Sequence, residues 1–366
     1  MSNATRTGRT ARESSAVSSI YLLDTEPDEA AHFQAALAGR GAVRCVARPS
    51  QVGPTAEVLS GFIHTPVDAA LLERLPALRL VATRSTGAEH IDLAACHARG
   101  VAVANVPSYG EHTVAEHTFA LIFALTRRLR DVTGEEAREG RLSYAATRAL
   151  ELHGKTLGVL GAGRVGRYVI AAAQAFGMRV LAFDIHTSSA GSPIAGFDFA
   201  PLAQVLAEAH LLTLHLPLAP ETRHLLNRDT LALCRPGVLI VNTARGALID
   251  TDALIDALDS GHVAGAGLDV LEEEGTARQE MTRVISDQII HRLHAVTGPA
   301  EVSEHQPDRV RELQNLLRNK RLVARPNVVF TPHVAFNSVE AVERINAITV
   351  ENILNFLDGR PTNLVG

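Results

Sequence analysis

Three side chains whose types suit the reduction of a carbonyl group follow predicted strands in this 366-residue chain. They are Arg245 in N-T-A-R-G, Glu274 in L-D-V-L-E-E-E and His333 in T-P-H. Hydride addition leaves an alkoxide that must be protonated, and histidine titrates near neutral pH. A neighbouring carboxylate would raise the pKa of the imidazolium, and a guanidinium can hold a carboxylate by two hydrogen bonds. Taken singly, each residue also has an ordinary explanation as a loop histidine, a solvated glutamate or an arginine in a surface ion pair.

A glycine-rich turn earlier in the chain has the pattern of a dinucleotide-binding site. A short apolar run over 157–160 leads into G-A-G-R-V-G, a helix pattern over 165–176 and a second strand pattern over 180–183. Gly161 would permit the tight turn, Gly163 the close approach of a pyrophosphate, and Gly166 the close packing of helix on strand. The first turn of the helix would offer N–H groups and a positive dipole end to the phosphates.

Asp184 closes this unit, 23 residues after Gly161 (184 − 161). That separation is close to the roughly 20 residues expected for the carboxylate that accepts the ribose 2′-OH. An acidic residue there repels a 2′-phosphate, so the pattern favours NAD over NADP. A plain structural turn is the alternative explanation. The order of strand, glycines, helix, second strand and aspartate favours the nucleotide.

The composition is that of a globular protein with room for about two domains. The hydrophobic fraction is 46%, the net charge −5 and the pI near 6.3, which gives no electrostatic case for nucleic acid or anionic membranes. No apolar run approaches the roughly 18 residues of a membrane span. Three cysteines, Cys45, Cys96 and Cys234, lie far apart without a C-x-x-C pair, as expected of small buried residues in a reducing cytoplasm.

The N-terminal residues 1–19 are rich in Ser, Thr and Arg, and we expect them to form a disordered tail. They lack the apolar core of a secretory signal, and Glu13 counts against a transit peptide. Beyond them, strand patterns over 20–23, 43–47, 78–83 and 101–106 alternate with helix patterns over 28–37, 68–75 and 91–98. This alternation predicts a parallel sheet covered by helices.

After Pro107, residues 111–130 are expected to form one long helix, followed by a loop with a short helix over 131–154. Further strands are predicted over 211–216, 238–242, 264–270 and 328–331, and further helices over 201–209, 251–258 and 339–357. The nucleotide unit lies in the middle of the chain. We therefore predict one domain from 20–110 with 337–366, and a second from 111–336. A charged insertion over 275–325, with helix patterns over 285–293 and 308–317, is expected at the periphery.

From about residue 78 to 357 the chain resembles the D-isomer-specific 2-hydroxyacid dehydrogenase family, and within it the D-lactate dehydrogenase-like branch. The motifs that carry the resemblance are S-T-G-A-E-H-I-D (85–92), N-V-P-S-Y-G-E-H-T-V-A-E-H (105–117), G-A-G-R-V-G (161–166), H-L-P-L-A-P-E-T (215–222), N-T-A-R-G-A-L-I-D (242–250), G-L-D-V-L-E-E-E (267–274) and T-P-H-V-A-F (331–336). The resemblance implies an α/β protein of two Rossmann-like or flavodoxin-like domains with parallel sheets, the NAD-binding domain being inserted into the substrate-binding domain.

The resemblance also implies roles for single residues. Arg245 would bind and orient the substrate, Glu274 would pair with the catalytic histidine, and His333 would be the acid/base. A slip of one residue would move the role of Glu274 to a neighbouring glutamate, and its separation from His333 is longer than is usual. Thr86 and Gly87 would grip the substrate carboxylate, with Tyr109 at the pocket. The remaining residues would contact the NAD cofactor: Gly161, Gly163, Arg164, Val165, Gly166, Asp184, His215, Pro217, Thr222, Thr243 and Asp269.

The first expected function is the NAD-dependent reduction of a small 2-keto acid to the D-2-hydroxy acid, with pyruvate as the leading substrate. The residues after His333, Val334-Ala335-Phe336, resemble the lactate branch. A glyoxylate or hydroxypyruvate reductase is the alternative enzyme, and an NAD(H)-sensing corepressor-like interaction protein is the alternative from another class. The resemblance implies a homodimer through 111–130. No metal site is expected, because His112 and His117 lie roughly 140° apart around their helix.

Overall fold

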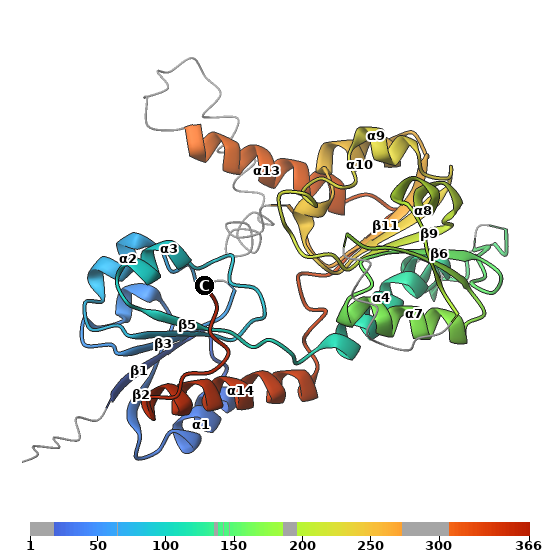
Figure 1. Cartoon of the computed structure of the whole chain (residues 1–366). Coiled ribbons are helices and arrows are strands. Elements are labelled where there is room, and N and C mark those ends of the chain that lie inside the picture. The colour runs from blue at the N-terminus through green and yellow to red at the C-terminus, as the bar shows by residue number, and fades with distance from the viewer. Residues whose placement is uncertain are drawn as a thin grey trace, which may run out of the picture. The chain divides into compact units, whose positions relative to one another are not determined.

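The computed structural model describes residues 18–63, 65–134, 138–141, 143–145, 147–185, 196–272 and 307–366, with the side chains of 307–313 left out. The chain divides into an N-terminal unit, 1–109 with 342–366, and a second unit, 110–341 (Figure 1). The expected boundaries lay at 110/111 and 336/337, so the second boundary falls a few residues later. Most of the expected tail lies outside the described residues, but Ser18 and Ser19 already belong to the first strand.

The N-terminal unit contains a five-stranded parallel sheet in the order β2-β1-β3-β4-β5. Its strands are β1 (Ser18–Leu23), β2 (Gly41–Val46), β3 (Val58–Gly61), β4 (Leu80–Thr83) and β5 (Ala102–Ala104). The order reverses between β1 and β3, as in flavodoxin-like sheets. Its helices are α1 (Pro27–Ala36), α2 (Ala69–Arg74), α3 (Leu93–Ala98) and α14 (Val339–Leu357), with a 3-10 turn over Pro49–Gln51.

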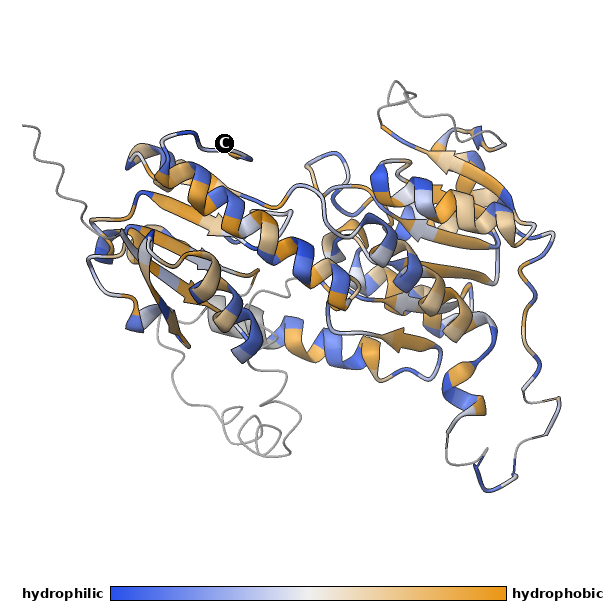
Figure 2. Ribbon diagram, turned by 90° about the horizontal axis from the view of Figure 1, so that it is seen from below, coloured by the Kyte–Doolittle hydropathy of each residue, from blue (hydrophilic) through white to orange (hydrophobic). Residues whose placement is uncertain are grey.

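Two apolar cores cover the two faces of this sheet. Leu71 and Leu72 of α2 and Cys96 of α3 pack on one face, and Phe33 of α1 and Ile353 of α14 pack on the other. Successive residues of a strand point to opposite faces, so Tyr21 joins the first core and Leu22 the second. Figure 2 shows the strands largely in the hydrophobic colour, whereas the helices also carry hydrophilic turns.

Strand β3 is absent from the elements expected from the sequence, although it is the central, fully buried strand of this sheet. Its four residues, V-L-S-G, include Ser60 and Gly61, so the apolar run is too short to mark a strand. Backbone pairing with β1 and β4 supplies the stability that the local sequence does not indicate.

The second unit contains a seven-stranded parallel sheet in the order β12-β11-β10-β9-β6-β7-β8. The strands are β6 (Thr156–Leu160), β7 (Arg179–Phe183), β8 (Asp198–Phe199), β9 (Leu211–Leu214), β10 (Val238–Asn242), β11 (Val263–Leu268) and β12 (Val328–Phe330). The order reverses between β6 and β9, which is the point where open parallel sheets bind nucleotides beyond the carboxyl ends of their strands.

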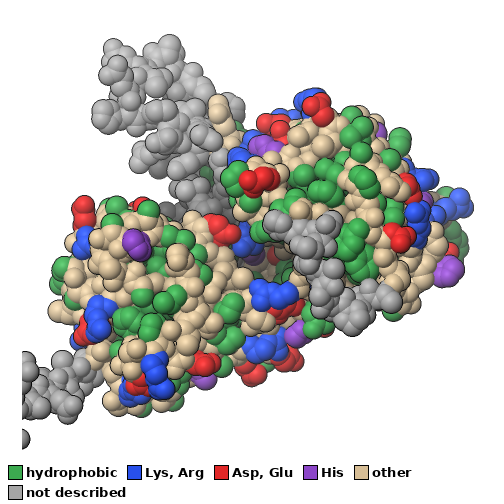
Figure 3. Space-filling view, viewed as in Figure 1, with side chains coloured by type: hydrophobic (Ala, Val, Ile, Leu, Met, Phe, Trp, Pro, Cys, Tyr) green, Lys and Arg blue, Asp and Glu red, His purple; other side chains and the backbone are tan. Residues whose placement is uncertain are grey.

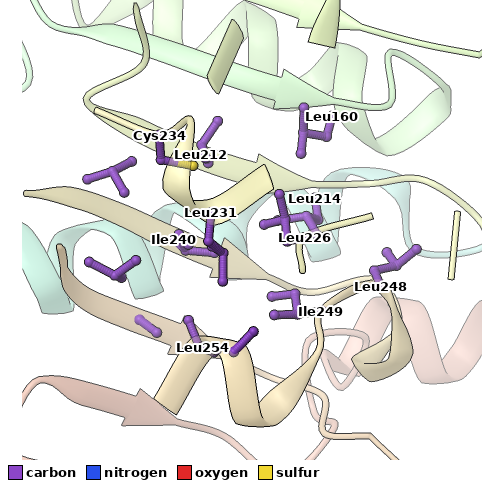
Figure 4. Close-up of a cluster of buried hydrophobic side chains, with 14 of the residues drawn as sticks. Leu160, Leu212, Leu214, Leu226, Leu231, Cys234, Ile240, Leu248, Ile249 and Leu254 are labelled. Atoms are coloured by element: carbon purple, nitrogen blue, oxygen red, sulfur yellow. The ribbon is translucent and has the colours of Figure 1, made fainter. Parts of the chain in front are cut away.

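Helices cover both faces of this sheet. Helices α4 (Glu111–Thr126) and α7 (Arg164–Ala175) pack on one core with Val159 and Val241. On the other face lie α8 (Leu202–Glu208), the unexpected α9 (Arg228–Ala232) and α10 (Thr251–Asp259). Figure 4 shows the second core, which joins strand residues such as Ile240 to Leu231 and Leu254 of the helices.

The long helix expected over 111–130 is interrupted. Helix α4 ends at Thr126, and α5 (Leu129–Val132) follows after Arg128, whose φ of +52° is left-handed. Neither glycine nor proline marks this break, so the apolar pattern alone suggested one helix. The hydroxyl of Thr126 donates a hydrogen bond to the carbonyl of Ile122 in the last turn of α4.

The expectation of a peripheral insertion over 275–325 is wrong for its C-terminal part. Residues 307–323 form α13 (Pro307–Val323), which leads into β12 beside its parallel neighbour β11. Parallel neighbours require a crossover of a dozen or more residues, and α13 belongs to it. Leu322 is buried in the core on the α10 face, and Arg318 reaches the carboxylates of Asp252 and Glu272. The helix pattern over 285–293 lies outside the described residues.

On the face seen in Figure 3, basic and acidic side chains lie interspersed over the described surface. Cys96 and Cys234 are buried as expected, whereas Cys45 on the edge strand β2 is exposed, contrary to expectation. Among the described helices, none combines the length and apolar character needed to cross a membrane.

Candidate functional site

The glycine loop follows β6 at the reversal of strand order. Gly161 has φ of +105°, and a Cβ there would lie 2.7 Å from the carbonyl carbon of His215, beyond β9. A Cβ on Gly166, in the first turn of α7, would overlap the carbonyl oxygen of Gly161. Around Gly163, by contrast, a Cβ would meet nothing within 4 Å. The first and third glycines therefore permit close backbone packing, and the second leaves open space over the start of the helix.

The N-terminus of α7 offers donors toward that space. Gly163 is the N-cap residue, and no side chain of the described residues caps the helix. The first N–H groups of a helix have no partner within it, so they and the helix dipole suit a phosphate. Arg164 is exposed and lies 3.4 Å from Glu111 of α4, while Val165 packs partly buried against the α4–α7 core.

Asp184 directly follows β7 and lies beside the same loop. Its Oδ2 accepts a hydrogen bond of 2.8 Å from the backbone N–H of Ala162, between the first two glycines. This places the carboxylate where a ribose on the glycine loop would need an acceptor. The open space at Gly163, the helix donors and this carboxylate together fit a dinucleotide.

His215 and the loop after it form the other side of the reversal point. Burial lowers the pKa of His215 to about 3, so its imidazole is neutral at neutral pH. Its Nε2 lies 2.9 Å from the hydroxyl of Thr213. Thr222 is buried, and its hydroxyl donates to the carbonyl of Pro217 and accepts from the N–H of Ala219. The structure therefore places Thr222 as the residue that holds the shape of this loop.

Arg245 follows β10 in a turn that its neighbours hold. The buried Asn242 side chain accepts from the N–H of Ala244 and donates to the carbonyl of Arg245. A Cβ on Gly246 would overlap the backbone of Leu271 and Glu272, so this turn packs directly against the segment that follows β11. Asn242 and Gly246 were missed as positioning residues. A buried asparagine at the end of an apolar run is the signal that could have found the first.

His333 follows β12 in a loop that Asp269 organises from the end of β11. His333 has a left-handed φ of +55°, and its N–H donates to the carbonyl of Asp269. The fully buried Asp269 carboxylate accepts from the Thr331 hydroxyl and from the N–H groups of Val334 and Ala335. Thr243, expected beside the nicotinamide, shares a hydrogen bond of 2.9 Å with Thr118 of α4.

The glutamate expected to pair with His333, Glu274, lies outside the described residues, as does Glu273. Glu272 is buried and held elsewhere. One of its carboxylate oxygens lies 2.6 Å from Nε2 of His224 and 3.1 Å from Arg223, and the other lies near Thr251 and Arg318. These partners bind both oxygens, so Glu272 links the segment after β11 to α10, α13 and the segment that contains Arg223 and His224.

The loop expected to hold a carboxylate lies in the N-terminal unit, after β4. The Thr86 hydroxyl donates to the carbonyl of Val106, and the Asn105 amide donates to the carbonyl of Thr86. Within the described residues, no hydrogen bond uses the N–H of Thr86 or Gly87, so both donors remain available to an anion. Tyr109 is the last residue of the first segment of this unit, and its carbonyl accepts a hydrogen bond from Arg344 of α14.

Arg84, directly before this loop, was not singled out from the sequence. Its guanidinium is buried and donates to the carbonyls of Leu23 and Asp24 and to Glu29. Burial lowers the pKa of Arg84, and the charges of Glu29 and Asp24 oppose that shift. Arg84 thus links the ends of β1 and β4, directly before the loop that contains Thr86 and Gly87. A charged residue at the end of an apolar strand was the available signal.

The structure therefore places two of the three predicted catalytic residues after strands that flank a common neighbour. Arg245 follows β10 and His333 follows β12, and both strands pair with β11. Parallel strands end at the same edge of a sheet, so both residues lie at the edge that carries the glycine loop. In the described residues, no group of three or more His, Cys, Asp or Glu side chains could hold a metal ion.

Comparisons with known proteins show which sequences and structures this chain resembles. A sequence model of the D-isomer specific 2-hydroxyacid dehydrogenase, NAD binding domain, matches residues 119–335. D-lactate dehydrogenase of Escherichia coli is 32% identical over 315 residues, which cover 84% of this chain and 86% of that protein. The crystal structure of D-lactate dehydrogenase from Aquifex aeolicus, complexed with NAD and lactic acid, has a TM-score of 0.75 at 30% identity and covers 93% and 96% of the two chains.

D-3-phosphoglycerate dehydrogenase of Mycobacterium bovis is 38% identical over 250 residues, which are 68% of this chain and 47% of that protein. The chain thus spans about half the length of that curated relative. The family match extends from within α4, through the glycine loop and the turn of Arg245 after β10, to the loop of His333. The chain belongs to the D-isomer specific 2-hydroxyacid dehydrogenase family, and its second unit contains the NAD-binding domain of that family.

Proposed function

We propose that this protein reduces a small 2-keto acid to the D-2-hydroxy acid with NADH, and that pyruvate is its leading substrate. The observation that carries the proposal is the placement of Arg245 and His333 after β10 and β12, at the edge of the sheet where the glycine loop lies. Support for pyruvate comes from the relatives named D-lactate dehydrogenase and from the neighbour complexed with NAD and lactic acid. The family resemblance further supports a homodimer.

Each residue has a proposed task in this reaction. When bound, the reduced nicotinamide supplies the hydride. In the second unit, the guanidinium of Arg245 would orient the substrate and polarise its carbonyl, since its planar fork can donate two parallel hydrogen bonds. The His333 imidazole would give a proton to the alkoxide oxygen, and Glu274 would stabilise the imidazolium beforehand. In the N-terminal unit, the N–H groups of Thr86 and Gly87 would bind the substrate carboxylate.

The substrate is tested by following the absorbance of NADH against a panel of 2-keto acids. The panel contains pyruvate, phenylpyruvate, 2-ketoisocaproate, glyoxylate, hydroxypyruvate and 3-phosphohydroxypyruvate. We expect the highest kcat/KM with pyruvate. A higher value with glyoxylate, hydroxypyruvate or the phosphorylated acid would reassign the substrate within the family. Clear NADH binding without turnover of any of them would instead favour an NAD(H)-sensing interaction protein.

Asp184→Ala should narrow the preference for NADH over NADPH by about 10- to 100-fold, because it removes charged hydrogen bonds to the ribose. It also removes the repulsion of a 2′-phosphate. Asp184→Asn is the matched control, because its amide oxygen can still accept from the N–H of Ala162. The ratio of kcat/KM for the two coenzymes is measured for all three proteins. An unchanged ratio in both variants would show that Asp184 does not hold the ribose.

A further inference from the structure

The loop that carries His333 adopts a conformation that its own sequence does not favour. A left-handed φ is uncommon for residues other than glycine, so contacts from outside the loop must stabilise it. Asp269 supplies most of them, through the hydroxyl of Thr331 at 2.6 Å and the two N–H groups that follow His333 at 2.9 Å. The orientation of the histidine therefore depends on the position of this buried carboxylate.

One further side chain reaches the same carboxylate from helix α4. Nε2 of His117 lies 2.9 Å from the hydroxyl oxygen of Thr331 and 3.5 Å from Oδ1 of Asp269. The His117 side chain is 22% exposed, and that of Asp269 is 1% exposed. Among the described residues, His117 is the one basic side chain within ion-pair distance of Asp269. Helix α4 packs against β10, β11 and β12, so it holds His117 in place.

The direction of these hydrogen bonds follows from their chemistry. Thr331 has a single hydroxyl proton, and it donates this proton to the Asp269 carboxylate. Nε2 of His117 must then carry a hydrogen and donate it to the Thr331 oxygen. The result is a chain of hydrogen bonds in which His117 donates to Thr331 and Thr331 donates to the Asp269 carboxylate. The same carboxylate accepts from the N–H groups of Val334 and Ala335, which follow His333 directly.

We propose that His117 is a positioning residue for His333, acting through Thr331 and Asp269. The inference rests on the proposed function, in which His333 is the acid/base. It assigns a task to a histidine that the sequence marked only as unable to form a metal site with His112. Its contribution is geometric: the donor chain fixes the loop so that the imidazole of His333 is held in one orientation before substrate arrives.

The first test replaces His117 with Phe, which fills the space without a donor. We expect kcat to fall by up to about 100-fold, since small misplacements of a catalytic group cost that much. The dissociation constant for NADH should change by less than about twofold, because the glycine loop is untouched. His117→Gln, whose amide nitrogen can donate from nearly the same place as Nε2, should restore most of the lost kcat.

Two further variants separate positioning from general damage. Thr331→Val breaks the chain at its middle link and should reproduce the loss, and the double variant should be no worse than either single one. His262→Phe is the matched control. This histidine lies directly before β11, at the amino ends of the strands and away from the loop of His333, and its Nε2 bonds to the Leu231 carbonyl. Its replacement should leave kcat unchanged.

His333→Gln is assayed in parallel to keep the two ideas apart. A folded His117→Phe protein with wild-type kcat, beside an inactive His333 variant, would overturn the positioning role alone. The positioning role would also be overturned if His117→Gln were as impaired as His117→Phe, or if His117→Phe lost only affinity for NADH. If the His333 variant itself retained wild-type turnover, the acid/base assignment would fail and the proposed function with it.

Discussion

Replacing His333 with Gln should lower kcat for pyruvate reduction by about 10²- to 10⁴-fold, the range expected for loss of a general acid. The alkoxide that forms at the substrate would then have to take its proton from water. The affinity for NADH should remain within about twofold of wild type, because the glycine loop and Asp184 follow β6 and β7, whereas His333 follows β12. Stopped-flow turnover and fluorescence titration of NADH measure the two quantities separately.

The backbone at this position calls for a second variant. His333 has φ of +55°, and asparagine adopts left-handed conformations more readily than most residues. In His333→Gln, activity could be lost because the loop moves and not because the acid is missing. His333→Asn controls for this, since asparagine tolerates the backbone conformation but cannot act as the acid. Both variants should lose turnover while melting near the wild-type temperature. Turnover at the wild-type rate in either variant would remove His333 from the mechanism.

The sequence predicted the strands and helices best where a long pattern coincides with burial. Strand β10 was expected over 238–242 and is Val238–Asn242, and α14 was expected over 339–357 and is Val339–Leu357. Strand β3 was not predicted, because its four residues include a serine and a glycine and its burial comes from β1 and β4. The helix pattern over 308–317 was assigned to an insertion because the surrounding stretch is long and charged, although Leu322 of α13 is buried in the core.

Some parts of the candidate site could likewise be predicted from the sequence, and others could not. Motif spacing predicted Arg245, His333 and the glycine loop, because these residues follow strands whose ends the apolar pattern marks. The partners of Asp269 could not be predicted, since the carboxylate meets Thr331, Val334 and Ala335 across more than 60 residues of chain. Its expected place beside the nicotinamide stays a prediction, whereas its hold on the histidine loop is a property of the fold. The roles in binding and catalysis that were expected of Arg245, His333, Glu274, Thr86 and Tyr109 stay predictions as well.

The same substitution at two glycines of the G-A-G-R-V-G loop should weaken NADH binding in both cases but lower the stability in only one. In Gly166→Ala, the new methyl group would overlap the carbonyl oxygen of Gly161, so backbone must move. Alanine is favoured over glycine inside a helix by only about 1 kcal/mol, and overpacking costs about 1–3 kcal/mol. The clash involves backbone, which cannot rotate away as a side chain can. We therefore expect a lower Tm and weaker NADH binding together.

Gly163→Ala should instead fold normally and bind NADH poorly. A Cβ there meets no protein atom within 4 Å, and its φ of −71° is one that alanine adopts. The methyl group would occupy the space over the helix N-terminus in which we place the pyrophosphate. Thermal melts without ligand and NADH titrations distinguish the two variants. Wild-type affinity in Gly163→Ala would place the pyrophosphate elsewhere, and an unchanged Tm in Gly166→Ala would mean that loop and helix can separate without cost.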